Sequence, residues 1–196
     1  HINPGLAIAD IIKSKYPDTE FLFAGTPKGM EAKLVPAAGY RFETIKVAGF
    51  QRRISLENIG RNAKAVAYLI TSGRRAKQII EGFKPDIAIG TGGYAAGPVI
   101  RKAARMGIPT AIHEQNAYPG VTNKLLSKEV DHVMLTVKEA LNFMDGSKFE
   151  HTVTGLPVRS NIKNSISRAE ARKKLGFNDD FTILSFGGSL GAGCIN

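Results

Sequence analysis

Residues 85–98, Pro-Asp-Ile-Ala-Ile-Gly-Thr-Gly-Gly-Tyr-Ala-Ala-Gly-Pro, decide the fold class. Asp86–Gly90 is a short apolar run with turn residues on both sides, a pattern typical of a buried strand in a parallel sheet. Closely spaced glycines and Pro98 follow, and Val99–Met106 then has the composition of a helix. A strand, a glycine turn and a helix in this order place free backbone N–H groups at a helix N-terminus, where an anion or a sugar hydroxyl can bind.

The same pattern returns near the end of the chain, where a strand-like run precedes a second glycine-rich turn. We expect strands at Glu20–Gly25, Tyr40–Val47, Asp86–Gly90, Pro109–His113, His132–Thr136, Thr152–Gly155 and Phe181–Phe186. We expect helices at Leu6–Lys15, Met30–Ala38, Asn58–Phe83, Val99–Met106, Val121–Lys128, Val137–Phe143 and Arg168–Leu175. This repeated alternation predicts a doubly wound, Rossmann-like α/β fold with a parallel sheet and right-handed crossovers.

The alternation also predicts how the chain divides into domains. We expect one domain over residues 1–156, a connector over residues 157–166 and the beginning of a second α/β domain over residues 167–196. The first apolar helix would normally follow a strand, and we expect residues upstream of His1 to supply that strand at the centre of the sheet. The alternative is that Phe181–Phe186 fills the slot, within one chain or by exchange between two chains.

Composition and charge limit the possible functions. The chain has 196 residues, of which 43% are hydrophobic, with one Cys and four His, so neither an internal disulfide nor a zinc site is expected. A net charge of +10 favours nucleic acid, an anionic membrane surface or a phosphate-bearing substrate as partner. Nucleic acid fits poorly because there is no RNA-stacking motif, no recognition-helix signature and no Trp.

More than half of the net charge of +10 comes from residues 51–84, which carry eight basic and two acidic side chains. One helical face there, expected to pack on the sheet, consists of Val66, Leu69, Gly73, Ala76, Ile80 and Phe83. Beside it lies a second set, Ala63, Ala67 and Ile70 with Arg74 and Lys77. This second set is either part of a wide core face with solubilising charges, which the residues alone favour, or an apolar patch with a cationic rim that rests on anionic lipid.

Four consecutive polar residues, His113-Glu114-Gln115-Asn116, end one of the predicted strands. Ligands of open parallel sheets bind beyond the carboxyl ends of the strands, so these side chains are placed for chemistry or recognition. They could equally tie down the following loop by hydrogen bonds. We favour a functional role because the run shares its edge of the sheet with the Gly92–Gly93 turn.

Six segments in order and in register resemble glycosyltransferase family 28, and within it the enzymes of bacterial peptidoglycan synthesis. They are His1–Ala7, Gly92-Gly93-Tyr94 with Gly97-Pro98, His113–Asn116, Thr122–Lys124, Leu156–Arg159 and Gly187–Ala192. The resemblance implies a glycosyltransferase-B fold with two Rossmann-like domains, the first for a lipid-linked acceptor and the second for most of the UDP-sugar site. It also favours the membrane interpretation of the basic patch, with a mostly electrostatic contact.

The resemblance also implies roles for individual residues. Its catalytic candidates are His1, His113 and Glu114; its acceptor-binding residues are Gly92, Gly93, Tyr94, Gln115 and Asn123; its donor-binding residues are Asn116, Arg159, Gly188 and Ser189. An imidazole suits proton removal near neutral pH, although His1 could instead make only a structural hydrogen bond at the helix start. Which of the three candidates is the base stays open at this stage.

The expected reaction is an inverting transfer of N-acetylglucosamine from its UDP donor to an undecaprenyl-linked muramyl-pentapeptide. The resemblance implies no cofactor, because enzymes of this fold stabilise the UDP leaving group with backbone dipoles and cationic side chains. It places the enzyme peripherally on the cytoplasmic face of the bacterial membrane, and we expect residues 1–196 by themselves to lack activity. The alternatives are another glycosyltransferase of this fold with a lipid-linked acceptor, or a UDP-binding module without catalysis.

Overall fold

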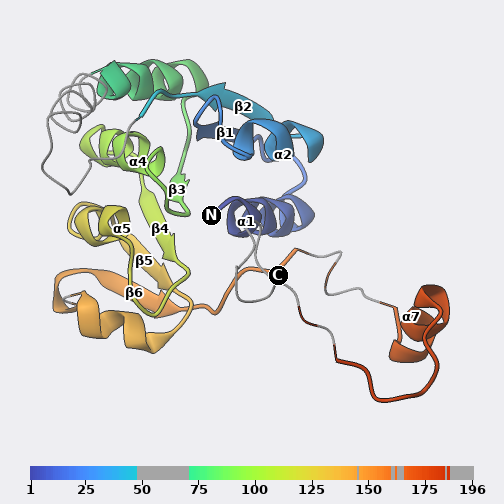
Figure 1. Ribbon diagram of the computed structural model, residues 1–196. Coiled ribbons are helices and arrows are strands. Elements are labelled where there is room, and N and C mark those ends of the chain that lie inside the picture. The colour runs from blue at the N-terminus through green and yellow to red at the C-terminus, as the bar shows by residue number, and fades with distance from the viewer. Residues whose placement is uncertain (48–70, 145, 160–161, 163–165, 184, 186–196) are drawn as a thin grey trace, which may run out of the picture. The chain divides into compact units, whose positions relative to one another are not determined.

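The computed structural model describes residues 1–47, 71–144, 146–159, 162, 166–183 and 185. The chain divides into two compact units, His1–Ser160 and Asn161–Asn196 (Figure 1). Each unit is described by itself below.

Two parallel sheets form the framework of the first unit. One contains β1 (Leu22–Gly25) and β2 (Arg41–Thr44), and the other has the order β3 (Ala88–Gly90), β4 (Thr110–Glu114), β5 (His132–Leu135), β6 (Glu150–Val153). Every strand pair is parallel, as expected for strands joined by crossover connections. Among the described residues β1 and β3 are not paired with each other, and a strand between them stays a prediction.

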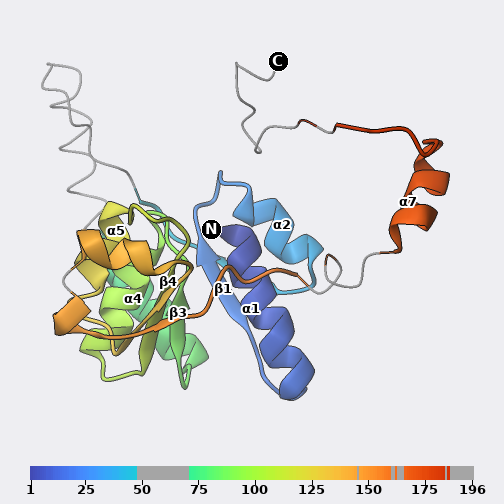
Figure 2. The same cartoon turned by 90° about the horizontal axis from the view of Figure 1, so that it is seen from below.

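Helices flank these sheets on two sides, which confirms the predicted α/β class and its doubly wound arrangement. In Figure 2, α1 (Ile2–Lys15) and α2 (Glu31–Ala37) lie on the opposite side of the strands from α4 (Ala96–Arg105) and α5 (Val121–Leu126). Residues 71–83 are also helical, and two short 3-10 helices follow β5, η1 (Lys138–Phe143) and η2 (Gly146–Lys148).

The main core lies around the larger sheet and brings the carboxyl end of β4 to a fixed position. Every residue of β4 is buried, and Ile112 packs with apolar residues of α4, α5, β5 and η1. The cluster consists of Ile100, Ile112, Leu126, Val130, Val133, Leu135, Ala140 and Met144. A strand buried on both faces is rigid, so the polar residues that follow it are held on a firm base.

Several boundaries differ from the sequence-based expectation. Helix α4 begins at Ala96, so Pro98 lies inside its first turn, where the missing N–H of proline is not needed. The helix expected at Val137–Phe143 is a 3-10 helix over Lys138–Phe143, and β6 begins at Glu150, before the expected Thr152.

The second unit contains α7 (Arg168–Leu175), as predicted. Its Ser167 accepts a hydrogen bond from the backbone N–H of Glu170 in a capping box, and Gly176 with φ 70° ends the helix. The prediction of a strand at Phe181–Phe186 is wrong for the part that the structure describes, since residues 181–183 and 185 do not form a strand. Phe181 and Ile183 are 91% and 79% exposed, and no strand of the described residues pairs with them.

Only part of the basic helical region is described. On residues 71–83, Ala76 and Ile80 are buried as expected for the sheet-facing side, whereas Arg74 and Lys77 are exposed. Ala63, Ala67 and Ile70 of the predicted membrane patch lie outside the described residues. Within the described residues, no helix is both long enough and apolar enough to cross a bilayer.

Candidate functional site

His1, the residue that precedes α1 as its N-cap, rests against the glycine turn that follows β3. The His1 Nδ1 atom lies 2.9 Å from the carbonyl oxygen of Thr91, and the Thr91 hydroxyl donates to the His1 carbonyl oxygen at 2.8 Å. Gly92 has φ +98°, and a Cβ there would lie 2.6 Å from His1 Nδ1. The turn therefore needs glycine at this position both for its backbone conformation and to leave room for the imidazole ring.

His113 lies at the end of β4 and is completely buried. Its Nε2 atom is 3.0 Å from the carbonyl oxygen of Gly155, which follows β6. Burial lowers the pKa of His113 below its ordinary value, because a charged ring is poorly solvated there, and this outweighs the opposite effects of the Gly155 carbonyl and Glu114. The ring is therefore neutral near pH 7.

Gln115 lies between the two histidines and contacts both. Its side-chain Nε2 donates to the carbonyl oxygen of His113 at 2.7 Å and lies 3.1 Å from His113 Nδ1. Its Oε1 lies 2.7 Å from Nδ1 of His1. The structure thus brings together three residues that the sequence assigned to catalysis or acceptor binding.

Glu114 points to a different set of partners. Its carboxylate is 1% exposed and accepts hydrogen bonds from the backbone and side-chain nitrogens of Asn116, both at 2.9 Å. It also accepts from the Gly120 N–H at 3.0 Å and from Asn123 Nδ2 at 2.8 Å. Four donors converge on this carboxylate, so it holds the loop between β4 and α5 in place.

The remaining predicted residues of this edge differ in their exposure. Tyr94 is 67% exposed beside the glycine turn, and Asn116 is exposed although its amide contacts Glu114. Asn123 is buried, and its Oδ1 has no hydrogen-bond partner in the part of the chain that the structure describes.

Arg159 belongs to the segment after β6 and contacts α1. Its Nε lies 3.3 Å from Oδ2 of Asp10, whose Oδ1 accepts from the Tyr40 hydroxyl at 2.8 Å. Burial and the hydrogen bond to Asp10 raise the pKa of Tyr40 to about 12. The predicted donor-binding Arg159 is therefore half-buried and paired at this position.

Some residues of the site were predicted and others were not. Gly188 and Ser189 lie outside the described residues. The sequence analysis missed three residues of the site: Thr91, Gly155 and Asp10. Thr91 and Gly155 contribute mainly their backbone carbonyls, and Asp10 lies in a helix with no distinctive motif. The proximity of Thr91 to the glycine pair was the one available signal.

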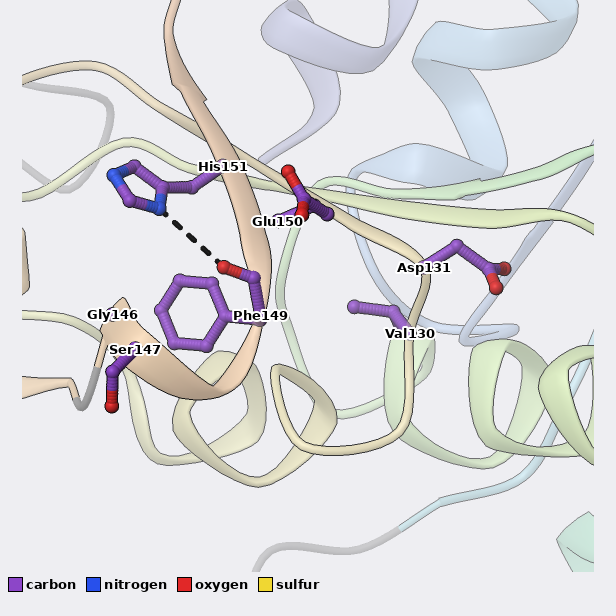
Figure 3. A pocket seen from close by; sticks show the side chains of 7 residues that line it. All are labelled: Val130, Asp131, Gly146, Ser147, Phe149, Glu150 and His151. Carbon is purple, nitrogen blue, oxygen red and sulfur yellow. Dashed lines mark hydrogen bonds between the residues drawn. The ribbon is translucent and has the colours of Figure 1, made fainter.

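An open hollow elsewhere in the first unit does not belong to this site (Figure 3). It is lined by Val130, Asp131, Gly146, Ser147, Phe149, Glu150 and His151. It lies at the amino ends of β5 and β6, whereas ligands of parallel sheets bind at the carboxyl ends. In the described residues, no cluster of three or more His, Cys, Asp or Glu is arranged to hold a metal ion.

Comparison with known proteins relates this geometry to one family. The model of the glycosyltransferase family 28 N-terminal domain matches residues 1–135. UDP-N-acetylglucosamine–N-acetylmuramyl-(pentapeptide) pyrophosphoryl-undecaprenol N-acetylglucosamine transferases are 52% identical in Acetivibrio thermocellus and 46% identical in Desulforamulus reducens, over 100% of this chain and 52% and 51% of those proteins. The crystal structure of Acinetobacter baumannii MurG matches 89% of this chain and 49% of its own, with a TM-score of 0.64 and 26% identity. The chain thus spans about half the length of the relatives that it matches.

Proposed function

This chain belongs to glycosyltransferase family 28, and we propose on that premise that it is the acceptor-binding part of a hexosyltransferase of cell-wall synthesis. The donor is UDP-N-acetylglucosamine and the acceptor is undecaprenyl-linked N-acetylmuramyl-pentapeptide, as in the names of the relatives. The observation that carries the proposal is the exposed His1 ring, seated on a glycine turn at the carboxyl edge of the parallel sheet.

His1 is the base in this proposal. Its Nε2 atom has no hydrogen-bond partner among the described residues, and its ring is exposed. His113 and Glu114, the other two candidates, are buried and fully engaged with neighbouring groups. A base must reach the proton that it removes, so exposure and a free nitrogen favour His1.

The reaction is a single inverting displacement. The acceptor hydroxyl oxygen bonds to the anomeric carbon of N-acetylglucosamine while its proton passes to Nε2 of His1. The bond between the anomeric carbon and the phosphate oxygen breaks, and UDP leaves with that electron pair. Backbone dipoles and cationic side chains stabilise the negative charge on the leaving group, with no cofactor.

The other predicted residues bind the two substrates. Gly92, Gly93 and Tyr94 face the acceptor diphosphate, with the N-terminus of α4 directly following them. The donor-binding group consists of Asn116, Arg159, Gly188 and Ser189. For Arg159 this role requires that it exchange Asp10 for a phosphate when the donor binds, and a guanidinium suits either partner.

The enzyme acts peripherally on the cytoplasmic membrane face, through the basic patch of residues 63–77. Sedimentation with anionic vesicles should fall on Arg74→Glu combined with Lys77→Glu, and vesicles of neutral lipid should bind neither protein. Equal sedimentation of both proteins with anionic vesicles would reject this patch. The proposal includes no nucleic-acid partner.

Transfer of radiolabelled N-acetylglucosamine from its UDP donor to the lipid-linked acceptor tests the proposed activity, in the full-length protein. His1→Ala should abolish incorporation while acceptor binding persists, and His151→Ala, at the opposite edge of the sheet, is the matched control. Absence of transfer with UDP still bound would instead leave a nucleotide-binding module. Transfer only to a different lipid-linked acceptor would identify another enzyme of the same fold.

A further inference from the structure

A continuous chain of hydrogen bonds links His1, Gln115, His113 and Gly155. Each contact has a definite direction, because carbonyl oxygens accept and never donate. Nε2 of His113 must carry a hydrogen, since its partner is the Gly155 carbonyl. With the buried ring neutral, Nδ1 of His113 is then an acceptor.

This acceptor fixes the orientation of the Gln115 amide. One amide hydrogen is donated to the His113 carbonyl oxygen at 2.7 Å, and the other points at His113 Nδ1, 3.1 Å away. Both neighbours accept, so the amide nitrogen has to face His113 and the amide oxygen has to face His1. A flipped amide would place Oε1 against two acceptors.

The oriented Gln115 amide acts together with the Thr91 carbonyl to determine which nitrogen of His1 carries the hydrogen. Nδ1 of His1 faces two acceptors, Gln115 Oε1 at 2.7 Å and the Thr91 carbonyl at 2.9 Å. Nδ1 therefore bears the hydrogen, and Nε2, which has no hydrogen-bond partner among the described residues, keeps a lone pair.

We propose that Gln115, anchored by His113, is a positioning residue that holds His1 in the Nδ1–H tautomer with its Nε2 lone pair available to the acceptor hydroxyl. In the catalytic step described above, the proton arrives at Nε2 and gives an imidazolium, whose Nδ1–H remains bonded to the amide oxygen. The arrangement follows the logic of a nucleophile's base oriented by a third group, with a neutral amide in that place. The catalytic part of this inference rests on the proposed function, whereas the tautomer itself does not.

The tautomer is measured by NMR of the full-length protein labelled with 15N in its histidine rings, at a pH where His1 is neutral. The expected spectrum has a pyrrole-type Nδ1 and a pyridine-type Nε2 for His1. Gln115→Leu should raise the fraction of the Nε2–H tautomer, and Gln78→Leu on the exposed face of residues 71–83 should not. A pyrrole-type Nε2 in the unmodified protein, or an unchanged tautomer fraction in Gln115→Leu, would overturn the inference.

Kinetics provide the second readout. Gln115→Leu should lower kcat roughly 10- to 100-fold with little change in KM for the UDP donor, because the base is no longer aligned. It should also move the acidic limb of the kcat/KM profile to lower pH, while Gln115→Glu, which places a charged oxygen at Nδ1, moves it to higher pH. If Gln115 had only a structural role, Gln115→Leu and Gln115→Glu would not shift the acidic limb in opposite directions. Acidic limbs that coincide in the two variants would therefore reject the positioning role. The expected tautomer in a protein without transferase activity would reject the proposed function alone.

Discussion

Replacing Glu114 by Gln separates a structural carboxylate from a catalytic one. The side chain is buried and receives four N–H donors, two on each oxygen. The amide of Gln keeps one oxygen as an acceptor but replaces the other oxygen with an NH2 group. That NH2 group, itself a donor, then faces the two N–H donors that the lost oxygen had accepted from. On the Oε1 side the exposed Asn116 amide can rotate to offer its oxygen, but the Asn116 backbone N–H stays unpaired. One lost charge-assisted bond and one unsatisfied donor in a part-buried contact together cost about 2–4 kcal/mol.

Urea unfolding of the chain measures this cost directly. Glu114→Gln should lower the free energy of unfolding by about 2–4 kcal/mol. Glu81→Gln is the matched control, because Glu81 forms an exposed pair with Lys77 at 3.4 Å and its loss should cost about 0.5 kcal/mol or less. If Glu114→Gln unfolds like the unmodified chain yet abolishes transfer in the full-length protein, the carboxylate acts in the chemistry and the structural reasoning is wrong.

Three further predictions concern neighbouring groups. Gly92→Ala should displace the His1 ring and reduce transfer at least tenfold, since the new Cβ would lie 2.6 Å from Nδ1, whereas Gly107→Ala, also at positive φ but in open space, should leave transfer intact. Burial lowers the pKa of His113, so below a pH of about 6.5 the unfolded chain binds a proton that the folded chain excludes. As the pH is lowered further, the free energy of unfolding should fall by up to about 1.4 kcal/mol per pH unit. His113→Gln should flatten this pH dependence in urea titrations, and an unchanged slope would contradict the prediction. Tyr40→Phe should remove the tyrosinate absorbance that develops near pH 12, because burial and a neighbouring carboxylate raise its pKa.

The fold was largely predictable because apolar runs of strand length alternate with helical segments. The boundaries of the elements were less predictable. The sequence analysis placed Pro98 before a helix, but the first turn of α4 tolerates proline and includes Pro98. The last predicted strand shows the same limit, since Phe181 and its neighbours have strand composition but pair with no strand among the described residues.

The sequence predicted that residues 113–116 belong to one site, but not which of them contact His1 and which hold the loop. Side chains alternate along an extended chain, so His113 and Gln115 share one direction while Glu114 and Asn116 share the other. The first pair connects to His1 and the second holds the loop. Alternation alone cannot tell which pair faces the substrate, because the contact with His1 crosses 114 residues of chain.

This long separation has a consequence for the order in which the protein folds. The bonds from His1 to Thr91 and Gln115 close loops of 90 and 114 residues, whereas β4 and β5 pair over short connections. Closing long loops is entropically costly until the intervening elements have condensed, so the contacts of the site form after the folding transition state. Substitutions among them should accelerate unfolding and leave the folding rate nearly unchanged. We therefore expect the candidate site to be the last part of this unit to assemble and the first to be lost.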